Sequence, residues 1–147
     1  MHCHTCKSSK DDLIYESDYW IVLLHKSQGY IGRCMIDLKR HAESLSDLTK
    51  DEWEDFISLI KKLEAALKKS FMATTFNLTF MMNDAFQEKP YNPHVHWHLR
   101  ARYDHDVEFE GITFKDPQFG KHYDRTYTQE ISNKIRTKII QKIKANI

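Results

Sequence analysis

The sequence predicts an α+β domain with a mainly antiparallel sheet of about five strands, one long central helix and a C-terminal helix. Hydrophobic patterns along the chain follow the order strands, helix, strands, helix, which is typical of α+β proteins. A length of 147 residues suits one domain with a real core. Neither an internal repeat nor a low-complexity linker divides the chain. We therefore expect a single domain over residues 1–147.

The first three predicted strands precede the long helix. The segments LIY (13–15) and DYWIVLLHK (18–26) are rich in β-branched and aromatic residues and are separated by a short polar turn. The segment QGYIGRCMIDLKRH then opens with a glycine-bearing turn and supplies a third strand over about Arg33 to Leu38. These strands form the first half of the expected sheet.

The central helix has the clearest local signals. Thr49 followed three residues later by Glu52 is a capping box, which marks a helix N-terminus. Apolar residues then recur at helical spacing, and lysines cluster toward the end. The apolar positions are Trp53, Phe56, Ile57, Ile60, Leu63 and Leu67. We expect this stripe to face the core.

Two further strands and a terminal helix follow. The segments TTFNLTFMMN (74–83) and HVHWHLRA (94–101) both favour strands. The aromatic stretch from Asp104 to Arg125, with two glycines and a proline, predicts an irregular connection. From Gln129 onward, isoleucines at 131, 135, 139 and 143 predict a helix with a basic outer face.

Composition narrows the function classes. A net charge of +1 gives no signature of a nucleic-acid or membrane partner, although a local cationic cluster could still bind a small anion. No apolar run approaches the roughly 20 residues of a membrane span. The N-terminal MHCHTCK lacks the apolar core of a secretion signal. We expect a cytoplasmic protein.

Cys3 and Cys6 have the C-x-x-C spacing, which in a cytoplasmic protein indicates metal binding or redox chemistry. A redox pair would open a helix after a strand, and no strand precedes these cysteines. Metal binding is the favoured interpretation, and a frayed histidine-rich tail is the alternative. Cys34 is expected to be a small core residue.

Three histidines alternate in PHVHWHLRARY (93–103). On a strand, His94, His96 and His98 share one face, and the apolar residues between them form a core face. A shared metal site, satisfied or surface histidines, and catalysis are all compatible with this pattern. Alternate residues lie about 7 Å apart along a strand, so three collinear ligands fit tetrahedral zinc poorly. One or two of them suit a metal better than all three.

Several motifs together resemble the histidine triad family. His94-Val-His96-Trp-His98-Leu matches its signature H-φ-H-φ-H-φ-φ, and GRCMIDLKRH is similar to its strand G-H-x-L-V-I-P-K-x-H before a helix. Asn83 lies eleven residues before His94, the separation at which members carry an active-site Asn. The N-terminal C-x-x-C recurs in a zinc-binding branch. The resemblance covers roughly residues 3 to 102 and implies a histidine-triad-like fold.

The zinc-binding branch holds its metal with the two cysteines, the histidine that ends P-K-x-H and the first triad histidine. The resemblance therefore implies a structural Zn²⁺ on Cys3, Cys6, His41 and His94. A closed tetrahedral site of this kind suits structure and does not suit the activation of water.

In the family the second triad histidine attacks the α-phosphorus of a nucleotide, and water hydrolyses the nucleotidyl-histidine. The resemblance gives this role to His96, a hydrogen bond to a phosphoryl oxygen or the leaving group to His98, and phosphate positioning to Asn83. Neutral imidazole is nucleophilic near pH 7. The attacking nitrogen needs its lone pair, so the other ring N–H needs an acceptor, which in the family is a backbone carbonyl of the same strand.

The chain departs from the family at the expected substrate-binding residues. Arg33 replaces a fourth active-site histidine, where it either clamps a phosphate or is simply exposed. His25 stands where members often place a ribose-binding Asp. The segment KPYN (89–92) replaces G-Q-S/T, so a leaving-group hydroxyl is absent unless Tyr91 supplies it. Arg100 takes a normally apolar motif position.

The favoured function is a nucleotidyl hydrolase acting on a small-molecule dinucleoside polyphosphate or nucleoside phosphoramidate. The alternative is a zinc-stabilised nucleotide-binding protein without turnover. Hydrolysis by a triad-bound metal is less favoured, because Cys3 and Cys6 would complete a closed site. The resemblance also implies a homodimer.

Overall fold

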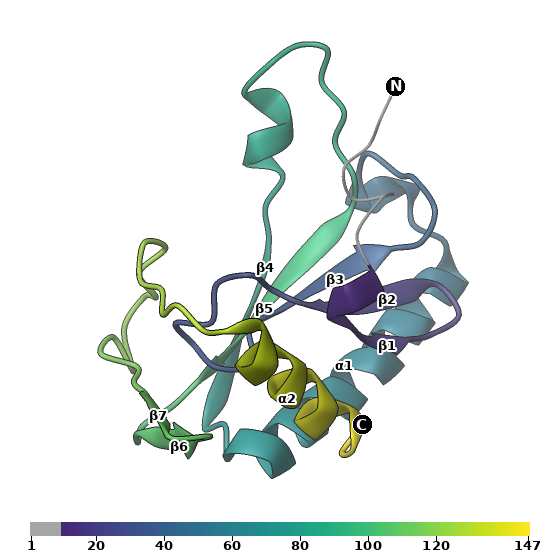
Figure 1. Ribbon diagram of the computed structural model, residues 1–147. Helices are drawn as coiled ribbons and strands as arrows, with labels where there is room; N and C mark the ends of the chain where they lie inside the picture. The colour runs from purple at the N-terminus through teal and green to yellow at the C-terminus, as the bar shows by residue number, and fades with distance from the viewer. Residues whose placement is uncertain (1–9) are drawn as a thin grey trace.

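The computed structural model describes residues 10–147, in which five strands form an antiparallel sheet flanked by two helices (Figure 1). The strand order is β1-β2-β3-β5-β4, and every neighbouring pair is antiparallel. The strands are β1 (Leu13–Glu16), β2 (Trp20–Leu24), β3 (Cys34–Leu38), β4 (Thr75–Phe80) and β5 (His96–Arg102). The predicted α+β class and the five strands are confirmed.

The long helix α1 (Lys50–Phe71) begins where the capping box predicted. The Thr49 side chain accepts from the Glu52 main-chain N–H, and the Glu52 carboxylate accepts from the Thr49 N–H. Most of the predicted apolar stripe packs into the core. Ile57 does not, since its side chain is 55% exposed and Leu59 takes the buried position instead. The helix presents a buried face to the sheet and a lysine-rich face to solvent.

The alternation predicted for the histidine strand is confirmed for β5. Leu99 and Ala101 are fully buried in the core, and Trp97 packs against Phe56 of α1 and Phe80 of β4. The opposite face carries the polar residues of the strand. A strand anchored on one face by packed aromatic and aliphatic side chains holds the other face in a fixed position.

The tail after β5 differs from the prediction. Instead of a wholly irregular connection it contains a hairpin of β6 (Val107–Phe109) and β7 (Ile112–Phe114). Its two-residue turn, Glu110–Gly111, has φ of 51° and 78°, the left-handed values that a tight hairpin needs. Apolar residues alternate on either side of this turn, which is the signal that sequence reasoning missed.

The terminal helix α2 (Asn133–Lys144) begins later than predicted, because the Ser132 hydroxyl caps it by accepting from the Ile135 N–H. It packs against β1 and α1.

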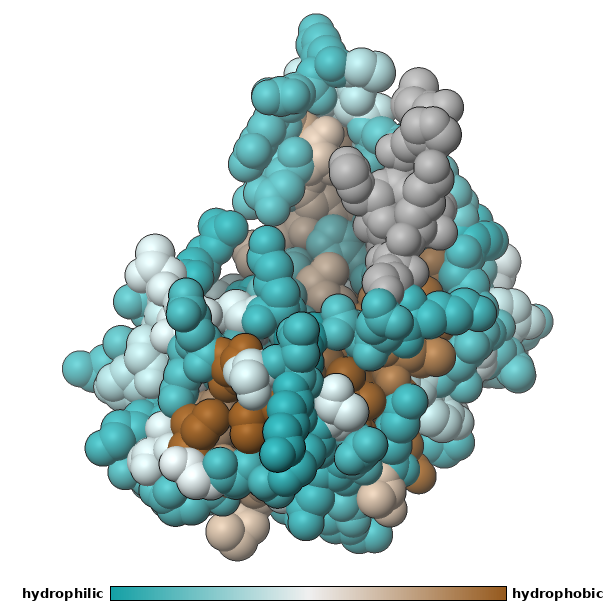
Figure 2. All heavy atoms as spheres, viewed as in Figure 1, coloured by the Kyte–Doolittle hydropathy of each residue, from teal (hydrophilic) through white to brown (hydrophobic). Residues whose placement is uncertain are grey.

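Short 3-10 helices span Lys10–Asp12, Leu45–Asp47 and Asn83–Phe86. Hydrophilic residues cover most of the face seen in Figure 2. Within residues 10–147, no helix has the length and apolar character of a membrane span.

Candidate functional site

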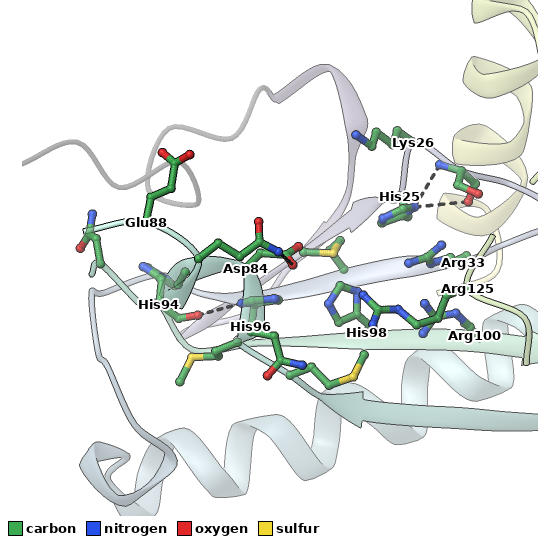
Figure 3. A pocket seen from close by; sticks show the side chains of 18 of the residues that line it. His25, Lys26, Arg33, Asp84, Glu88, His94, His96, His98, Arg100 and Arg125 are labelled. Carbon is green, nitrogen blue, oxygen red and sulfur yellow. Dashed lines mark hydrogen bonds between the residues drawn. The ribbon is translucent and has the colours of Figure 1, made fainter. Parts of the chain in front are cut away.

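A cleft of about 950 Å³ opens on the polar face of β5. Its walls come from the chain after β2, from β3, from the loop between β4 and β5, and from residues 125–128. Figure 3 shows the three histidines in a row along the cleft. Acidic Asp84 and Glu88 lie toward the His94 end, and Arg33, Arg100 and Arg125 lie toward the His98 end (Figure 3). The cleft therefore has an acidic end and a cationic end.

His96 is held by the main chain two residues before it. Its Nδ1 lies 2.8 Å from the carbonyl oxygen of His94 (Figure 3). Since a carbonyl can only accept, Nδ1 carries the proton and Nε2 keeps the lone pair. This is the hydrogen bond that the sequence analysis expected for an attacking imidazole. His96 is half-buried, and it lines the cleft.

His98 is the more enclosed neighbour of His96. The two ring centroids lie 5.0 Å apart, and the His98 ring lies 6.2 Å from that of His25. Burial, reinforced by His96 and Arg33, lowers the pKa of His98 to about 3. Its Nδ1 is buried and makes no hydrogen bond to any residue of the described range. His98 is therefore a neutral imidazole at pH 7, with hydrogen-bonding capacity left for a ligand.

His25 follows β2 and lines the same cleft. Its Nδ1 lies 3.0 Å from the Ser27 main-chain nitrogen and 3.3 Å from the Ser27 carbonyl oxygen, so it accepts from the first or donates to the second according to the tautomer. Burial, followed by the charge of Arg33, lowers the pKa of His25 to about 3. The residue in the place of the family's ribose-binding Asp is thus a neutral imidazole rather than an anionic acceptor. It offers a nucleoside hydroxyl a different kind of partner.

Arg33 is buried, with only 8% of its surface exposed, so the interpretation of Arg33 as a simply exposed residue is wrong. Arg100 is 2% exposed, and its guanidinium carbon lies 3.8 Å from the centroid of the Tyr123 ring. Burial and the neighbouring Arg100 lower the pKa of Arg33 to about 10, which leaves it charged at neutral pH. Both arginines line the cleft.

The C-terminal segment closes the cationic end of the cleft. Arg102 anchors it through a buried ion pair with Asp116, with Nε 2.6 Å from Oδ2 and Nη2 2.9 Å from Oδ1. The anchored segment then returns toward β5, where Tyr123 packs on Arg100 and Arg125 lines the cleft. Sequence reasoning had not placed Arg125 or Arg100 among the site residues. The period-two continuation of the histidine face was the signal for Arg100.

His94 faces a different partner from the other two histidines. Its Nε2–H donates to the Leu38 carbonyl oxygen at 2.7 Å, which leaves the lone pair on Nδ1. That Nδ1 lies 3.2 Å from the Nδ1 of His41. Burial is the main cause that lowers the pKa of His94. His94 precedes β5, which begins at His96 rather than at the predicted position.

The predicted metal ligands are only partly visible. His41 and His94 come together as a pair, whereas Cys3 and Cys6 lie outside the described residues. Between residues 10 and 147, no group of three or more His, Cys, Asp or Glu side chains could hold a metal ion. The pair alone therefore supplies at most half of a four-ligand site.

The loop between β4 and β5 brings one predicted residue to the cleft and leaves another outside it. Asn83 opens a 3-10 helix and lines the cleft beside Asp84. Tyr91 is 45% exposed, packs on Phe86 with ring centroids 5.1 Å apart, and is not part of the cleft lining. Tyr91 therefore does not supply the missing hydroxyl. Hydroxyl groups do reach the cleft from Ser27, Thr126 and Thr128.

Comparisons with known proteins agree with this fold. A histidine triad protein from Bradyrhizobium japonicum is 18% identical, with 94% of this chain and 92% of that chain covered and a TM-score of 0.67. A hypothetical histidine triad nucleotide-binding protein from Sulfolobus tokodaii is 18% identical, with 97% and 93% covered and a TM-score of 0.65. A Zn-bound histidine triad family protein from Mycobacterium smegmatis is 15% identical, with 96% and 88% covered and a TM-score of 0.62.

At these identities the solved structures establish the fold alone. No curated protein sequence matches the chain. In a comparison with protein families, residues 7–105, which are more than half of the chain, match the HIT domain. This range includes all three alternating histidines and the strand before the long helix. The chain therefore belongs to the HIT domain family.

Proposed function

We propose that this protein is a nucleotidyl hydrolase that cleaves at the α-phosphate of a dinucleoside polyphosphate or a nucleoside phosphoramidate, with His96 as the nucleophile. The single observation that carries the proposal is the 2.8 Å hydrogen bond from His96 Nδ1 to the His94 carbonyl. It puts the lone pair on Nε2 and gives the positive charge of a phosphorylated imidazole an oxygen partner.

The reaction has two displacements. The Nε2 lone pair forms a bond to phosphorus, the bond from phosphorus to the leaving group breaks, and the leaving group departs with the bonding electrons and takes up a proton. Water then attacks the phosphorus, the P–N bond breaks, its electrons return to Nε2, and the proton that water loses passes to solvent. Such a transition state is stabilised mainly by hydrogen-bond donors around the phosphoryl oxygens.

Neighbouring side chains supply those donors. His98 is neutral because its burial lowers its pKa to about 3, so one ring nitrogen carries a proton for a phosphoryl oxygen or the leaving group. Asn83 lies at the start of the 3-10 helix that lines the cleft, and its amide N–H₂ would position the phosphate. His25, in the chain after β2, offers its ring Nε2 to the ligand, because its Nδ1 is already in contact with the Ser27 main chain.

A structural zinc fits the residues beside this site. Two nitrogen ligands about 2.0–2.1 Å from a tetrahedral zinc are separated by about 3.3–3.4 Å, and the Nδ1 atoms of His41 and His94 lie 3.2 Å apart. Cys3 and Cys6 would complete the set. Zinc bound to four protein ligands would add folding free energy and tie the N-terminus to the segments after β3 and before β5, which carry His41 and His94.

A homodimer is also proposed. Among residues 10–147, β4 pairs only with β5, so β4 forms an edge of the sheet. An exposed edge strand offers unpaired backbone groups to another chain, and a symmetric dimer is the commonest way to cover one. Sedimentation equilibrium at micromolar concentration checks this, and a purely monomeric protein would exclude it.

The second candidate is a zinc-stabilised nucleotide-binding protein without turnover. It is favoured by Arg33 in place of the family's fourth histidine and by Tyr91 lying outside the cleft. Turnover of adenosine and guanosine phosphoramidates and dinucleoside polyphosphates, measured with and without chelator, decides between the two. Activity that survives chelation supports the hydrolase. Nucleotide binding with no turnover of any of these substrates supports the second candidate.

A further inference from the structure

Two arginines stand side by side at the cationic end of the cleft. The antiparallel register pairs Cys34, the first residue of β3, with Leu99 of β5. Arg33 immediately precedes β3 and Arg100 immediately follows Leu99, so the two residues are adjacent across the end of this pairing. Like charges in such cross-strand positions destabilise a sheet. The mutual repulsion is visible in the pKa of Arg33, which burial and Arg100 both lower. The pair is therefore unfavourable in the free protein.

Neither guanidinium has an anionic partner among residues 10–147. Arg33 and Arg100 form no ion pair or side-chain hydrogen bond with the described residues, and the buried Nε atoms of both and Nη1 of Arg100 are unsatisfied. Arg102, two residues further on the same face, gives the contrast. Its guanidinium is held by Asp116, by the Asn77 side chain and by two main-chain carbonyls. Within residues 10–147 the fold thus satisfies one buried guanidinium fully and leaves two without a counterion or a side-chain hydrogen bond.

Unpaired buried charges lower the stability of a protein, so such groups indicate a place where a ligand completes the interactions. Both arginines line the cleft immediately beyond His98 (Figure 3). The ring of Tyr123, stacked 3.8 Å from the Arg100 guanidinium carbon, holds that side chain in place before any ligand arrives. Arg125 adds a third cation at the same end.

We propose that Arg33 and Arg100 form a second anion subsite, which binds a phosphoryl group of the ligand other than the one that His96 attacks. A phosphoryl group accepts two parallel hydrogen bonds from each guanidinium fork and supplies the missing negative charge. The loop at the opposite end lines the cleft with two carboxylates, Asp84 and Glu88, and one cation, Lys89, whereas three arginines line the His98 end. The balance of charge favours an anion at the arginines, and in this proposal the phosphate chain runs from His96 past His98 to them. A nucleoside monophosphate, whose one phosphoryl group lies at His96, leaves this subsite unfilled.

The proposal rests on the proposed function only for the position of the first phosphoryl group, and binding tests it without turnover. Isothermal titration calorimetry on the His96→Asn variant measures the affinity for two pairs of ligands. The first pair is adenosine monophosphate and adenosine diphosphate, and the second is inorganic phosphate and pyrophosphate. We expect the compound with two phosphoryl groups to bind at least about tenfold tighter in each pair. Arg100→Met and Arg33→His should each weaken its binding by roughly 10- to 100-fold, because charge-assisted hydrogen bonds are lost. The affinity for adenosine monophosphate should change far less.

Two controls separate this effect from a general loss of charge. Arg100→Lys keeps the charge without the planar fork, so it should retain an intermediate preference. Lys61→Gln removes an exposed charge on α1 and should leave all affinities unchanged. Equal affinity for one and two phosphoryl groups, or a preference that persists in Arg100→Met, overturns the subsite. A missing nucleotidyl adduct with the preference intact instead overturns only the hydrolase.

Thermal unfolding gives an independent readout. Arg100→Met removes an unpaired buried charge but keeps a long apolar stem on Tyr123, so the free variant should unfold at a higher temperature than the parent. Pyrophosphate should raise the unfolding temperature of the parent and not that of the variant. If Arg100→Met unfolds at a lower temperature and pyrophosphate stabilises both proteins equally, Arg100 has a structural role and the subsite is excluded.

Discussion

His96 and His94 are joined by a hydrogen bond that runs from the ring of one to the main-chain carbonyl of the other, at 2.8 Å. The ring of His94 is itself bound through Nε2 to the Leu38 carbonyl. The two imidazoles therefore keep their lone pairs on different nitrogens, Nε2 in His96 and Nδ1 in His94. Opposite tautomers give neighbouring histidines different chemical capacities, which suits a nucleophile beside a metal ligand.

Replacing His96 separates chemistry from binding. His96→Asn should keep the fold, zinc and nucleotide affinity and lose nearly all turnover, because the attacking lone pair is gone. A quenched reaction of the original chain with a slow substrate should trap an acid-labile adduct on the peptide that carries His96. An adduct on a peptide without His96, or undiminished turnover by His96→Asn, would overturn the mechanism.

His98→Asn should have an intermediate effect. It removes one hydrogen-bond donor to the developing charge, and such a loss raises the barrier by about 2.7–4 kcal/mol, or roughly 10²–10³ in kcat. Steady-state kinetics on the same substrate measure it, with thermal unfolding as the check on folding. A loss equal to that of His96→Asn would contradict a role for His98 limited to one hydrogen bond.

Zinc should bind at about one per chain. Cys6→Ala, His41→Ala and His94→Asn should each lose the metal and much stability, because three remaining ligands make an incomplete site. His122→Ala, at an exposed histidine in the C-terminal segment, is the matched control and should keep its zinc. Elemental analysis that finds full zinc in Cys6→Ala and His41→Ala would place the site elsewhere.

Stability should fall as the pH drops below about 6.5. The folded-state pKa of His25 and that of His98 are both lowered to about 3, from an ordinary value of 6.5. Between these values the unfolded chain binds more protons than the folded chain, so the free energy of unfolding rises with pH across this window. Urea unfolding at pH 5 and pH 7 measures the difference.

Removing either histidine should weaken this pH dependence. His25→Asn and His98→Asn should each show a smaller loss of stability between pH 7 and pH 5 than the original chain. His122→Asn, at an exposed position, should behave like the original chain. If both buried-site variants lose as much stability on acidification as the control, the acid sensitivity arises outside His25 and His98.

The buried pair of Arg102 and Asp116 should contribute strongly to stability. Both side chains are almost fully buried, so Asp116→Asn leaves the Arg102 charge without its counterion and should lower the free energy of unfolding by about 3–5 kcal/mol. Asp106→Asn removes the exposed ion pair with Lys115 and should cost at most about 1 kcal/mol. Similar urea midpoints for the two variants would contradict this difference.

The sequence by itself determined the elements whose signals are local. The capping box of Thr49 and Glu52 placed the start of α1, and period-two alternation identified the polar and apolar faces of β5. Both depend on residues a few positions apart, whose geometry the backbone sets directly. The signal for the hairpin turn at Glu110–Gly111 is also local. The sequence analysis nevertheless predicted an irregular connection there, because the segment is rich in aromatic residues.

Only the tertiary structure decided which charges at the site have partners. Arg33 precedes β3 at the end of its pairing with β5 and so lies beside Arg100, and Tyr123, in the segment that the buried Arg102–Asp116 ion pair anchors, packs on Arg100. In the sequence all three arginines are simply cations on or next to strands. The burial of a guanidinium and the identity of its neighbours depend on contacts between segments that are distant in the sequence. These contacts decide whether the buried charge has a counterion within the fold or is left to be paired by a ligand.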